Sequence, residues 1–120
     1  MAITYKVGEK GTRPWGNWEV LDVGQEYIVK RIVVNPKGKL SLQSHDFRAE
    51  HWIIAEGVGR ITLDDKIFDA PQDAPIYIQK GQKHRIENPT ENPVIFIEVQ
   101  TGKTLDENDI HRYEDIYGRT

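Results

Sequence analysis

The sequence predicts an all-β fold in a single domain. Short runs rich in Val, Ile, Tyr and Phe are separated by turn signals at intervals of about ten residues, a spacing typical of antiparallel sandwiches and barrels. No long segment repeats its apolar residues with the 3.6-residue period of an amphipathic helix. The length of 120 residues suits one domain, residues 1–120, that buries its own core without disulfides or structural metals.

The strand-like runs can be followed from residue 27 to residue 100. The first, YIVKRIVV at Tyr27–Val34, consists mainly of β-branched residues, which favour extended backbone. The turn NPKG at Asn35–Gly38 ends it, because proline and glycine interrupt strands. Later runs, separated by signals such as EGVG, DDK, KGQK and NPTENP, are Leu40–His45, His51–Ala55, Arg60–Leu63, Ile67–Asp69, Ala74–Gln79, His84–Glu87 and Val94–Gln100. Together they predict a barrel over residues 25–101.

The two ends of the chain differ from this central region. Residues 1–24 are rich in glycine and predict an N-terminal arm, whose most distinctive part is RPWGNW at Arg13–Trp18. Residues 102–120 predict a tail packed on the barrel, with a short helical turn in it. The residues that favour this turn are Thr104 and Asp106 as caps, and Ile110 and Tyr113 three positions apart.

Composition and charge limit the class of function. The net charge of -3 argues against a nucleic-acid binder, because such proteins present a basic face. No apolar run reaches the ~20 residues that span a bilayer, and the N-terminus lacks a signal-peptide stretch. The absence of cysteine excludes thiol catalysis and thiolate metal sites. We therefore expect a cytoplasmic protein that binds no membrane and no nucleic acid, although a few local cations would suffice for a small anion.

Ligating side chains gather in the segment SLQSHDFRAEHW at Ser41–Trp52. Side chains two residues apart on a strand point to the same face, so Gln43 and His45 can approach one ion together. Glu50 follows after an expected bend, and a hairpin would bring its carboxylate beside His45. His84, which follows the turn KGQK, is a further candidate from another strand.

Two imidazoles, a carboxylate and an amide oxygen suit a divalent transition metal. Imidazole favours zinc, nickel, iron or copper, and the oxygen ligands also admit manganese. A catalytic site would keep one coordination position for water or substrate. Taken one at a time, however, a histidine in a strand is more often a packed or solvated residue than a ligand, and glutamine is an uncommon ligand.

Several segments in order make the chain similar to a known family. They are RPWG at Arg13–Gly16, YIVKRIVVNPKGKLSLQ at Tyr27–Gln43, RAEHW at Arg48–Trp52, GQKHRIENP at Gly81–Pro89, IEVQTG at Ile97–Gly102 and DIHRYEDIYGR at Asp109–Arg119. The chain resembles the type II mannose-6-phosphate isomerases, which are cupins, that is, double-stranded β-helix or jelly-roll barrels. In many bacteria that domain is fused behind a mannose-1-phosphate guanylyltransferase. The resemblance covers nearly the whole chain.

The resemblance also places the residues of the two cupin motifs. They are Gln43, His45, Glu50 and Gly57 in the first motif, and Gly81, His84 and Asn88 in the second. The implied ligands of a divalent metal, with zinc or manganese favoured over nickel or iron, are Gln43, His45, Glu50 and His84. Two positions depart from the family: Phe47 stands where a second histidine is usual, and Gln79 replaces a proline. We expect Phe47 to neighbour the site without binding the metal.

The activity that the resemblance implies is the interconversion of mannose 6-phosphate and fructose 6-phosphate. A proton moves between C2 and C1 through an enediol, while the metal stabilises the charge that develops on the oxygens. A base must reach that proton, and the phosphate needs cations away from the metal. The expected ligand is thus a small sugar phosphate. Family habit and exposed strand edges also favour a homodimer.

Lys30 and Arg85 are the candidate catalytic cations. Lys30 shares a strand face with isoleucines, where a lysine is costly unless it meets an anion; the alternative is an outward lysine at a sheet edge. Arg85 follows His84 and should face away from it unless a bulge changes its direction. The alternative for Arg85 is a surface ion pair with Glu87.

Glu98 is the candidate base, since it interrupts the apolar run VIFIEVQ. An inward carboxylate there would be functional, and an outward one would only contact solvent. His51 is the rival base, although alternation turns it away from the metal ligands. Arg48, Lys30 and Trp15 are the candidates for substrate binding. The alternative for Arg48 is a solvated arginine in a turn, and the alternative for Trp15 is a core aromatic.

Two other functions stay open at this level. One is a non-catalytic cupin that binds a sugar phosphate, and the other is a metal cupin with different chemistry, such as an oxygenase or another sugar isomerase. The cupin fold supports many reactions, so the fold alone cannot choose among them. Formation of fructose 6-phosphate with zinc or manganese supplied separates the isomerase from the binding protein.

Overall fold

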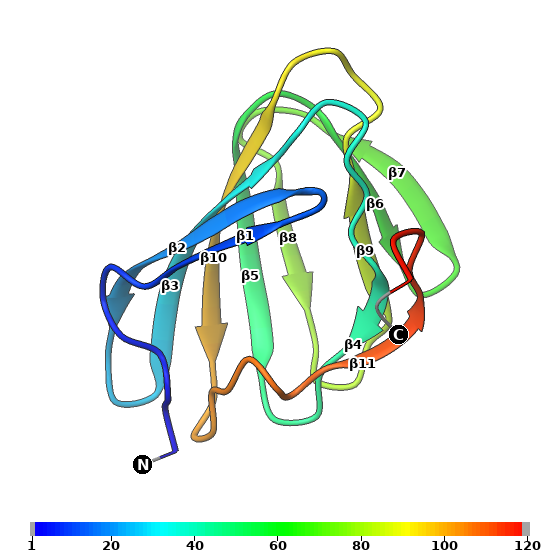
Figure 1. Cartoon of the computed structure of the whole chain (residues 1–120). Coiled ribbons are helices and arrows are strands. Elements are labelled where there is room, and N and C mark those ends of the chain that lie inside the picture. The colour runs from blue at the N-terminus through cyan, green and yellow to red at the C-terminus, as the bar shows by residue number, and fades with distance from the viewer. Residues whose placement is uncertain (1, 119–120) are drawn as a thin grey trace.

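The computed structural model describes residues 2–118, which form two antiparallel β-sheets facing each other (Figure 1). No helix occurs among these residues, so the predicted all-β fold is confirmed. The strands are β1 (Lys10–Arg13), β2 (Gly16–Val23), β3 (Tyr27–Val34), β4 (Leu42–Ser44), β5 (Ala49–Glu56), β6 (Gly59–Leu63), β7 (Lys66–Ala70), β8 (Pro75–Ile78), β9 (His84–Glu87), β10 (Val94–Thr101) and β11 (His111–Glu114).

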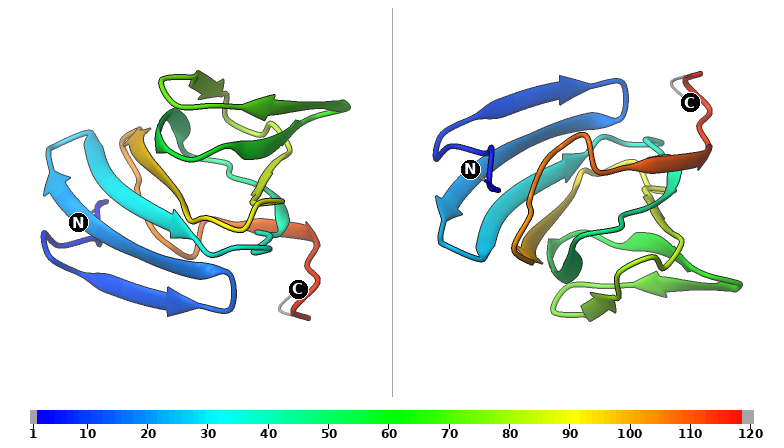
Figure 2. Two further views of the ribbon diagram at one scale, coloured as in Figure 1. Left: turned by 90° about the horizontal axis from the view of Figure 1, so that it is seen from above. Right: turned by 90° about the horizontal axis from the view of Figure 1, so that it is seen from below.

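The order of the strands is that of a jelly roll. One sheet has the order β1-β2-β3-β10-β5-β8, and the other has the order β11-β4-β9-β6-β7. From β3 onward most connections cross from one sheet to the other, because neighbours in sequence are seldom neighbours in a sheet. Figure 2 shows the two sheets, viewed from above and below, as walls around a common interior.

Alternation along the strands gives the barrel interior an apolar end and a polar end. On β10, Phe96 points inward into the core, and Glu98 and Gln100 follow on the same buried face. The neighbouring strands are in register with this change: Glu98 lies opposite Lys30 of β3, and Gln100 lies opposite Glu50 of β5. The polar end of the barrel therefore concentrates ionisable side chains from adjacent strands.

Residues 10–23, which the sequence places in an N-terminal arm, form β1 and β2 and extend the six-stranded sheet beyond β3. The glycines that make this segment look irregular have a packing reason. A Cβ atom on Gly11 would lie only 2.3 Å from the indole of Trp18, so only glycine lets that ring lie across β1. The indole is buried in the core.

The predicted helical turn in the C-terminal tail is wrong. The Asp106 carboxylate accepts the backbone N–H of Asn108 at 2.9 Å, which forms a turn confined to these residues. The Asp109 carboxylate accepts the N–H groups of Asp46 and Phe47 from another part of the chain. Residues 111–114 then pair with β4 as the edge strand β11. Asp106, one of the predicted caps, thus closes a local turn instead of starting a helix.

Two residues of the cupin motifs hold loops at the opposite end of β5 and β10 from Glu50. Gly57 has φ +85°, and a Cβ there would approach the carbonyl oxygen of Pro93 to 2.7 Å. Asn88 is buried and donates to the carbonyl groups of Val34 and Asn92 at 3.0 and 2.7 Å. These contacts fix the β5–β6 and β9–β10 turns, and so the spacing of the strands that carry the polar end.

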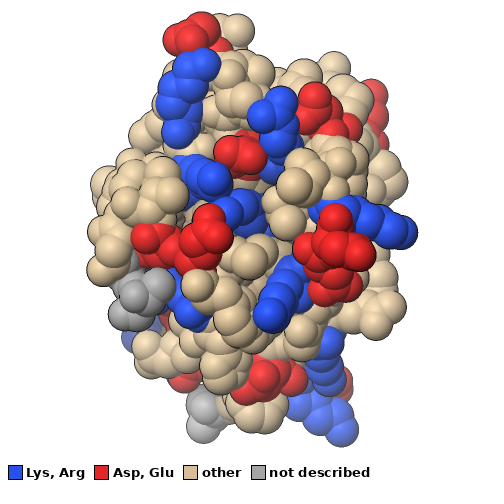
Figure 3. All heavy atoms as spheres, turned by 90° about the vertical axis from the view of Figure 1, so that its right-hand side faces the viewer, with Lys and Arg blue, Asp and Glu red and all other residues tan. Residues whose placement is uncertain are grey.

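The surface of the molecule carries mixed charge. Basic and acidic side chains are interspersed over the face in Figure 3, where neighbours of opposite sign largely cancel each other at a distance. Among residues 2–118 no helix is long and apolar enough to cross a membrane.

Candidate functional site

His45, Glu50 and His84 come together at the polar end of the barrel. Each offers one ligand atom, and these atoms lie within 4.8 Å of one another. Nε2 of His45 is 3.1 Å from Oε2 of Glu50, and Nε2 of His84 is 4.0 Å from Oε1 of Glu50. The histidines follow β4 and begin β9 in one sheet, whereas Glu50 lies on β5 in the other. The cluster therefore bridges two sheets, and no β4–β5 hairpin is involved.

Backbone carbonyl groups orient both imidazole rings. Nδ1 of His45 is 2.6 Å from the carbonyl oxygen of Asp109, and Nδ1 of His84 is 2.9 Å from that of Gln82. A carbonyl oxygen only accepts hydrogen bonds, so each Nδ1 carries a proton and each Nε2 is the ring atom turned toward Glu50. Burial also lowers the pKa of His84, which keeps its imidazole neutral.

This donor set fits a divalent transition metal. Two imidazole nitrogens and an ionised carboxylate are common ligands of such ions, and the backbone contacts at Nδ1 are the usual outer partners of ligating histidines. The indole N–H of Trp52 donates to Oε1 of Glu50 at 2.9 Å and orients the carboxylate. The three side chains are all buried. They could thus hold an ion, and the identity of that ion stays a prediction.

Arg48 belongs to this cluster and not to a solvated turn. Its side chain is buried, its Nε donates to Oε2 of Glu50 at 2.8 Å, and its Nη2 lies 3.2 Å from Nε2 of His45. Burial alone would raise the pKa of Glu50. The Arg48 charge, with hydrogen bonds from Glu98 and His45, instead holds that pKa well below its ordinary value, so Glu50 is ionised.

Glu98 is held in the opposite protonation state. Burial, the charge of Glu50 and a hydrogen bond to Glu50 raise the pKa of Glu98 to about 8, although Lys30 and Arg48 act in the other direction. The amide of Gln100 donates to Oε2 of Glu98 at 3.1 Å. Two buried carboxyl groups therefore share one proton at neutral pH, a pattern that separates an acid–base group from an ionised partner.

Lys30 is buried and points into the barrel interior. Of the two orientations considered from the sequence, it has the inward one and not the outward one at a sheet edge. Its ammonium lies 4.2 Å from the ring centre of Tyr5 and 4.3 Å from that of Trp18, and it donates to the Tyr5 hydroxyl at 3.2 Å. Burial lowers the pKa of Lys30, while the nearby carboxyl groups, Glu98 first among them, oppose this effect. The aromatic rings partly replace the water that this charge has lost.

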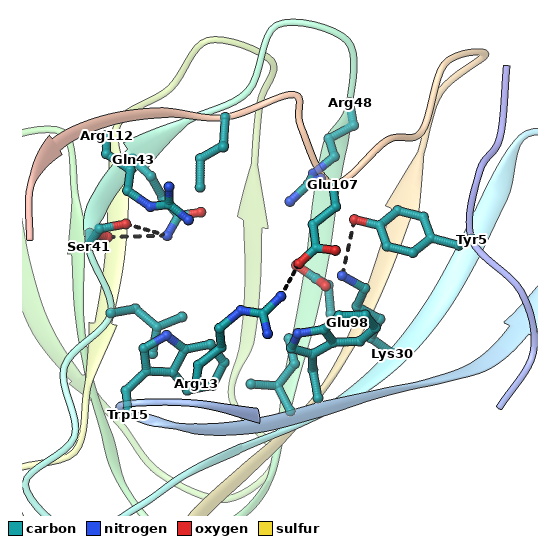
Figure 4. Close-up of a pocket in the computed structure, with 14 residues that line it drawn as sticks. Tyr5, Arg13, Trp15, Lys30, Ser41, Gln43, Arg48, Glu98, Glu107 and Arg112 are labelled. Atoms are coloured by element: carbon teal, nitrogen blue, oxygen red, sulfur yellow. Dashed lines mark hydrogen bonds and ion pairs between the residues drawn. The ribbon is translucent and has the colours of Figure 1, made fainter. Parts of the chain in front are cut away.

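Two adjoining hollows open onto these residues. The larger, here called the outer cleft, has a volume of about 100 Å³, and its charged lining consists of Arg13, Lys30, Arg48, Glu98, Glu107 and Arg112 (Figure 4). The smaller, here called the inner hollow, has a volume of about 30 Å³ and reaches Glu50 and His84. The residues that line both are Ile32, Leu40, Gln43 and Glu98. Glu98 thus lies at the boundary between the outer cleft and the inner hollow that reaches Glu50 and His84.

Gln43 and Trp15 both line the outer cleft. The Gln43 amide donates to the hydroxyl and the carbonyl oxygen of Ser41 at 3.0 and 3.3 Å, and the side chain also lines the inner hollow. Gln43 pairs with His84 across β4 and β9. Its position is compatible with a fourth ligand, and that role stays a prediction.

The other candidates lie at the edge of this region or outside it. The Arg85 guanidinium is bound to a backbone carbonyl and to the Glu114 carboxylate at 2.9 Å, which ties β9 to β11. A catalytic role for Arg85 stays a prediction. His51 is exposed and packs against the Tyr77 ring on the outer face, 4.7 Å between ring centres. Phe47 is 55% exposed, so it points to the surface.

Several residues of the outer cleft do not stand out in the sequence. Tyr5 comes from the N-terminal segment, Arg13 from the end of β1, and Glu107 and Arg112 from the C-terminal segment (Figure 4). Arg13 and Arg112 do lie inside the strings RPWG and DIHRYEDIYGR that carry the family resemblance. The charged residues in these strings could therefore have been proposed as lining the cleft. No sequence motif around Tyr5 or Glu107 indicates that they do so.

The shared proton makes the stability of the metal-free protein depend on pH. Between the ordinary pKa of glutamate and about 8, folded Glu98 keeps a proton that the unfolded chain has lost. We therefore expect the free energy of unfolding to fall, on the order of 2 kcal/mol, as pH rises from 6.5 to 8.5. Urea titrations after chelator treatment measure this. In the Glu98→Gln variant the decline should be smaller, and an equal decline would contradict the assignment.

Comparisons with known proteins agree with this geometry. The sequence model described as "Mannose-6-phosphate isomerase C-terminal" matches residues 3–115. The alginate biosynthesis protein AlgA of Pseudomonas aeruginosa is 47% identical over 108 residues, which are 90% of this chain and 22% of AlgA. A mannose-1-phosphate guanylyltransferase of Escherichia coli is 42% identical over 115 residues, 96% of this chain and 24% of that protein. The chain thus spans about a quarter of the length of these relatives.

A solved structure supports the fold alone. A Klebsiella pneumoniae protein with a double-stranded β-helix domain superposes with a TM-score of 0.71 at 15% sequence identity, over 95% of this chain and 92% of that chain. The predicted double-stranded β-helix is thereby confirmed.

Proposed function

The chain belongs to the mannose-6-phosphate isomerase C-terminal family, and on that premise we propose that it interconverts mannose 6-phosphate and fructose 6-phosphate with a divalent metal. The observation that carries the proposal is the position of Glu98. Its carboxyl group is buried, lines both the outer cleft and the inner hollow, and has a pKa of about 8. A sugar that extends from one hollow into the other passes this group.

Glu98 has the properties that the proton transfer needs. The reaction removes a proton from one carbon and returns it to the next, so one group must be able to hold it in between. A carboxyl group with a pKa near the working pH both accepts and releases a proton with little loss. Ionised Glu50, which is hydrogen-bonded to Glu98, keeps that balance by disfavouring a second negative charge.

The residues that would hold the ion are His45, Glu50 and His84, with Gln43 beside them. An ion bound there would polarise the sugar oxygens at C1 and C2. Within the chain itself, the Arg48 and Lys30 cations lie in the same cleft and favour negative charge that develops on those oxygens. Trp15 and Trp18 line the cleft wall and limit the access of water.

A coupled assay tests this proposal. The purified chain, treated with a chelator and resupplied with zinc or manganese, should form fructose 6-phosphate from mannose 6-phosphate and should lose this activity without metal. Unphosphorylated mannose serves as the control substrate. The Glu98→Gln variant, purified in the same way, corrects for isomerase from the expression host. Binding of mannose 6-phosphate without turnover would support the non-catalytic alternative and refute the isomerase.

A further inference from the structure

A carboxylate of the protein itself, that of Glu107, lies in the outer cleft. Figure 4 shows the Glu107 side chain directed into the cleft, where its carboxylate pairs with Arg13. The same cleft is lined by Lys30, Arg48 and Arg112. Glu50 is paired with Arg48 deeper in the barrel, so Glu107 is the carboxylate that faces these cations from the more exposed side of the cleft.

The backbone around Glu107 is fixed on both sides. Leu105 is fully buried, and its backbone bonds to Ala2 and Thr4 at 2.8 and 3.1 Å. Asp109 holds the N–H groups of the 46–47 turn and the His45 ring. Residues 106–108 therefore form a short bridge between two anchors. Within that bridge the Glu107 side chain can rotate without any movement of the segment.

The Arg13–Glu107 pair is one that a ligand can replace. The two side chains are 31% and 46% exposed, and ion pairs with such access to water contribute little to stability. Arg13 also keeps a second support that does not depend on Glu107, because its guanidinium lies 5.5 Å from the ring centre of Trp18. Loss of Glu107 from the pair would thus leave the Arg13 side chain in the cleft.

We propose that the outer cleft is a phosphomonoester subsite in which the phosphoryl group of the ligand displaces the Glu107 carboxylate from Arg13. A phosphomonoester carries more negative charge than a carboxylate and offers three acceptor oxygens, so it can bind Arg13 and still reach a second cation. Arg112, which lines the cleft on the Gln43 side in Figure 4, is the candidate for that second contact. The identity of the sugar rests on the proposed function, whereas the phosphate contact does not.

This arrangement makes Glu107 a competitor of the phosphoryl group, and Arg13 the group that distinguishes phosphorylated from unphosphorylated sugars. A sugar without a phosphate has no group that replaces the carboxylate on Arg13, so it must bind beside an occupied cation. A sugar phosphate removes the carboxylate and gains the cation. Glu107 therefore lowers the affinity of phosphorylated ligands, which must displace its carboxylate, and does not compete with unphosphorylated sugars.

Titration calorimetry with inorganic phosphate tests the subsite directly. The metal-free full chain is compared with Glu107→Gln, Arg13→Gln and the control Glu91→Gln. Glu91 is a matched control because its side chain is 82% exposed and pairs with Lys37 outside the cleft. We expect phosphate to bind about five-fold more tightly to Glu107→Gln, at least ten-fold more weakly to Arg13→Gln, and unchanged to Glu91→Gln. Circular dichroism of each variant checks the fold.

The result separates this subsite from the proposed activity. Wild-type phosphate affinity in folded Arg13→Gln, or no gain in Glu107→Gln relative to Glu91→Gln, would overturn the subsite even if the protein isomerises mannose 6-phosphate. Conversely, the expected phosphate affinities in a protein without isomerase turnover would support the subsite and refute the proposed function.

Discussion

Replacing Glu98 with glutamine is expected to lower kcat for mannose 6-phosphate by about 10²- to 10⁴-fold, the usual contribution of a general acid–base group. The amide occupies the same space and cannot take up the C2 proton. It can still donate a hydrogen bond to Glu50, as the protonated carboxyl group of Glu98 does. The surrounding contacts, including that from Gln100, are therefore retained, and the loss should be chemical and not structural.

Exchange of the C2 hydrogen with solvent provides the sharper measurement. Mannose 6-phosphate labelled with deuterium at C2 should lose its label to water in the wild type and keep it in Glu98→Gln. Glu56→Gln, at the exposed end of β5, is the matched control and should behave as the wild type does. If Glu98→Gln retains more than a tenth of the turnover and of the label exchange, the base is another group.

The central strands could be predicted because their local pattern and their environment agree. Tyr27–Val34 and His84–Glu87 have the same limits in the structure as in the sequence interpretation. In the first, β-branched residues alternate between core and surface, and a proline–glycine turn ends the strand. Where the period of two and the turn signal coincide, no distant contact is needed to define a strand.

The two ends could not be predicted because distant partners decide their structure. The strands β1 and β2 depend on Gly11 making room for Trp18, which the glycine-rich sequence does not reveal. The strand β11 exists because β4 offers it a free edge, although Thr104 and Asp106 favour a helical start. Contacts across the barrel outweigh local preference in both places.

The candidate site divides in the same way. Strand alternation predicts Gln43 and His45 on one face, and the resemblance adds Glu50 and His84. His45, Glu50 and His84 converge only because the two sheets close on each other. Arg48 looks like a solvated residue in a bend and becomes buried because that bend folds over the polar end. The proton shared by two carboxyl groups depends on strand register, which single residues do not encode.

Replacing His84 with glutamine is expected to remove most of the bound metal while preserving the fold. The imidazole of His84 is neutral, because burial lowers its pKa, so a neutral amide leaves no buried charge unpaired. Glu50→Gln is a poorer test, since it leaves the buried Arg48 guanidinium without its carboxylate. Metal analysis after gel filtration should fall from about one zinc or manganese per chain to a small fraction of that.

Thermal unfolding gives an independent measure of the same loss. Free metal at a few hundred times its Kd should stabilise the wild type by about 3 kcal/mol and raise Tm by roughly 10 °C, whereas His84→Gln should show little change. The control is His51→Gln, which removes an imidazole next to Glu50 in sequence but on the outer face of β5. Only the inward histidine should matter, because strand alternation gives the two rings different surroundings. Full metal loading of His84→Gln, or equal losses in both variants, would contradict the ligand set.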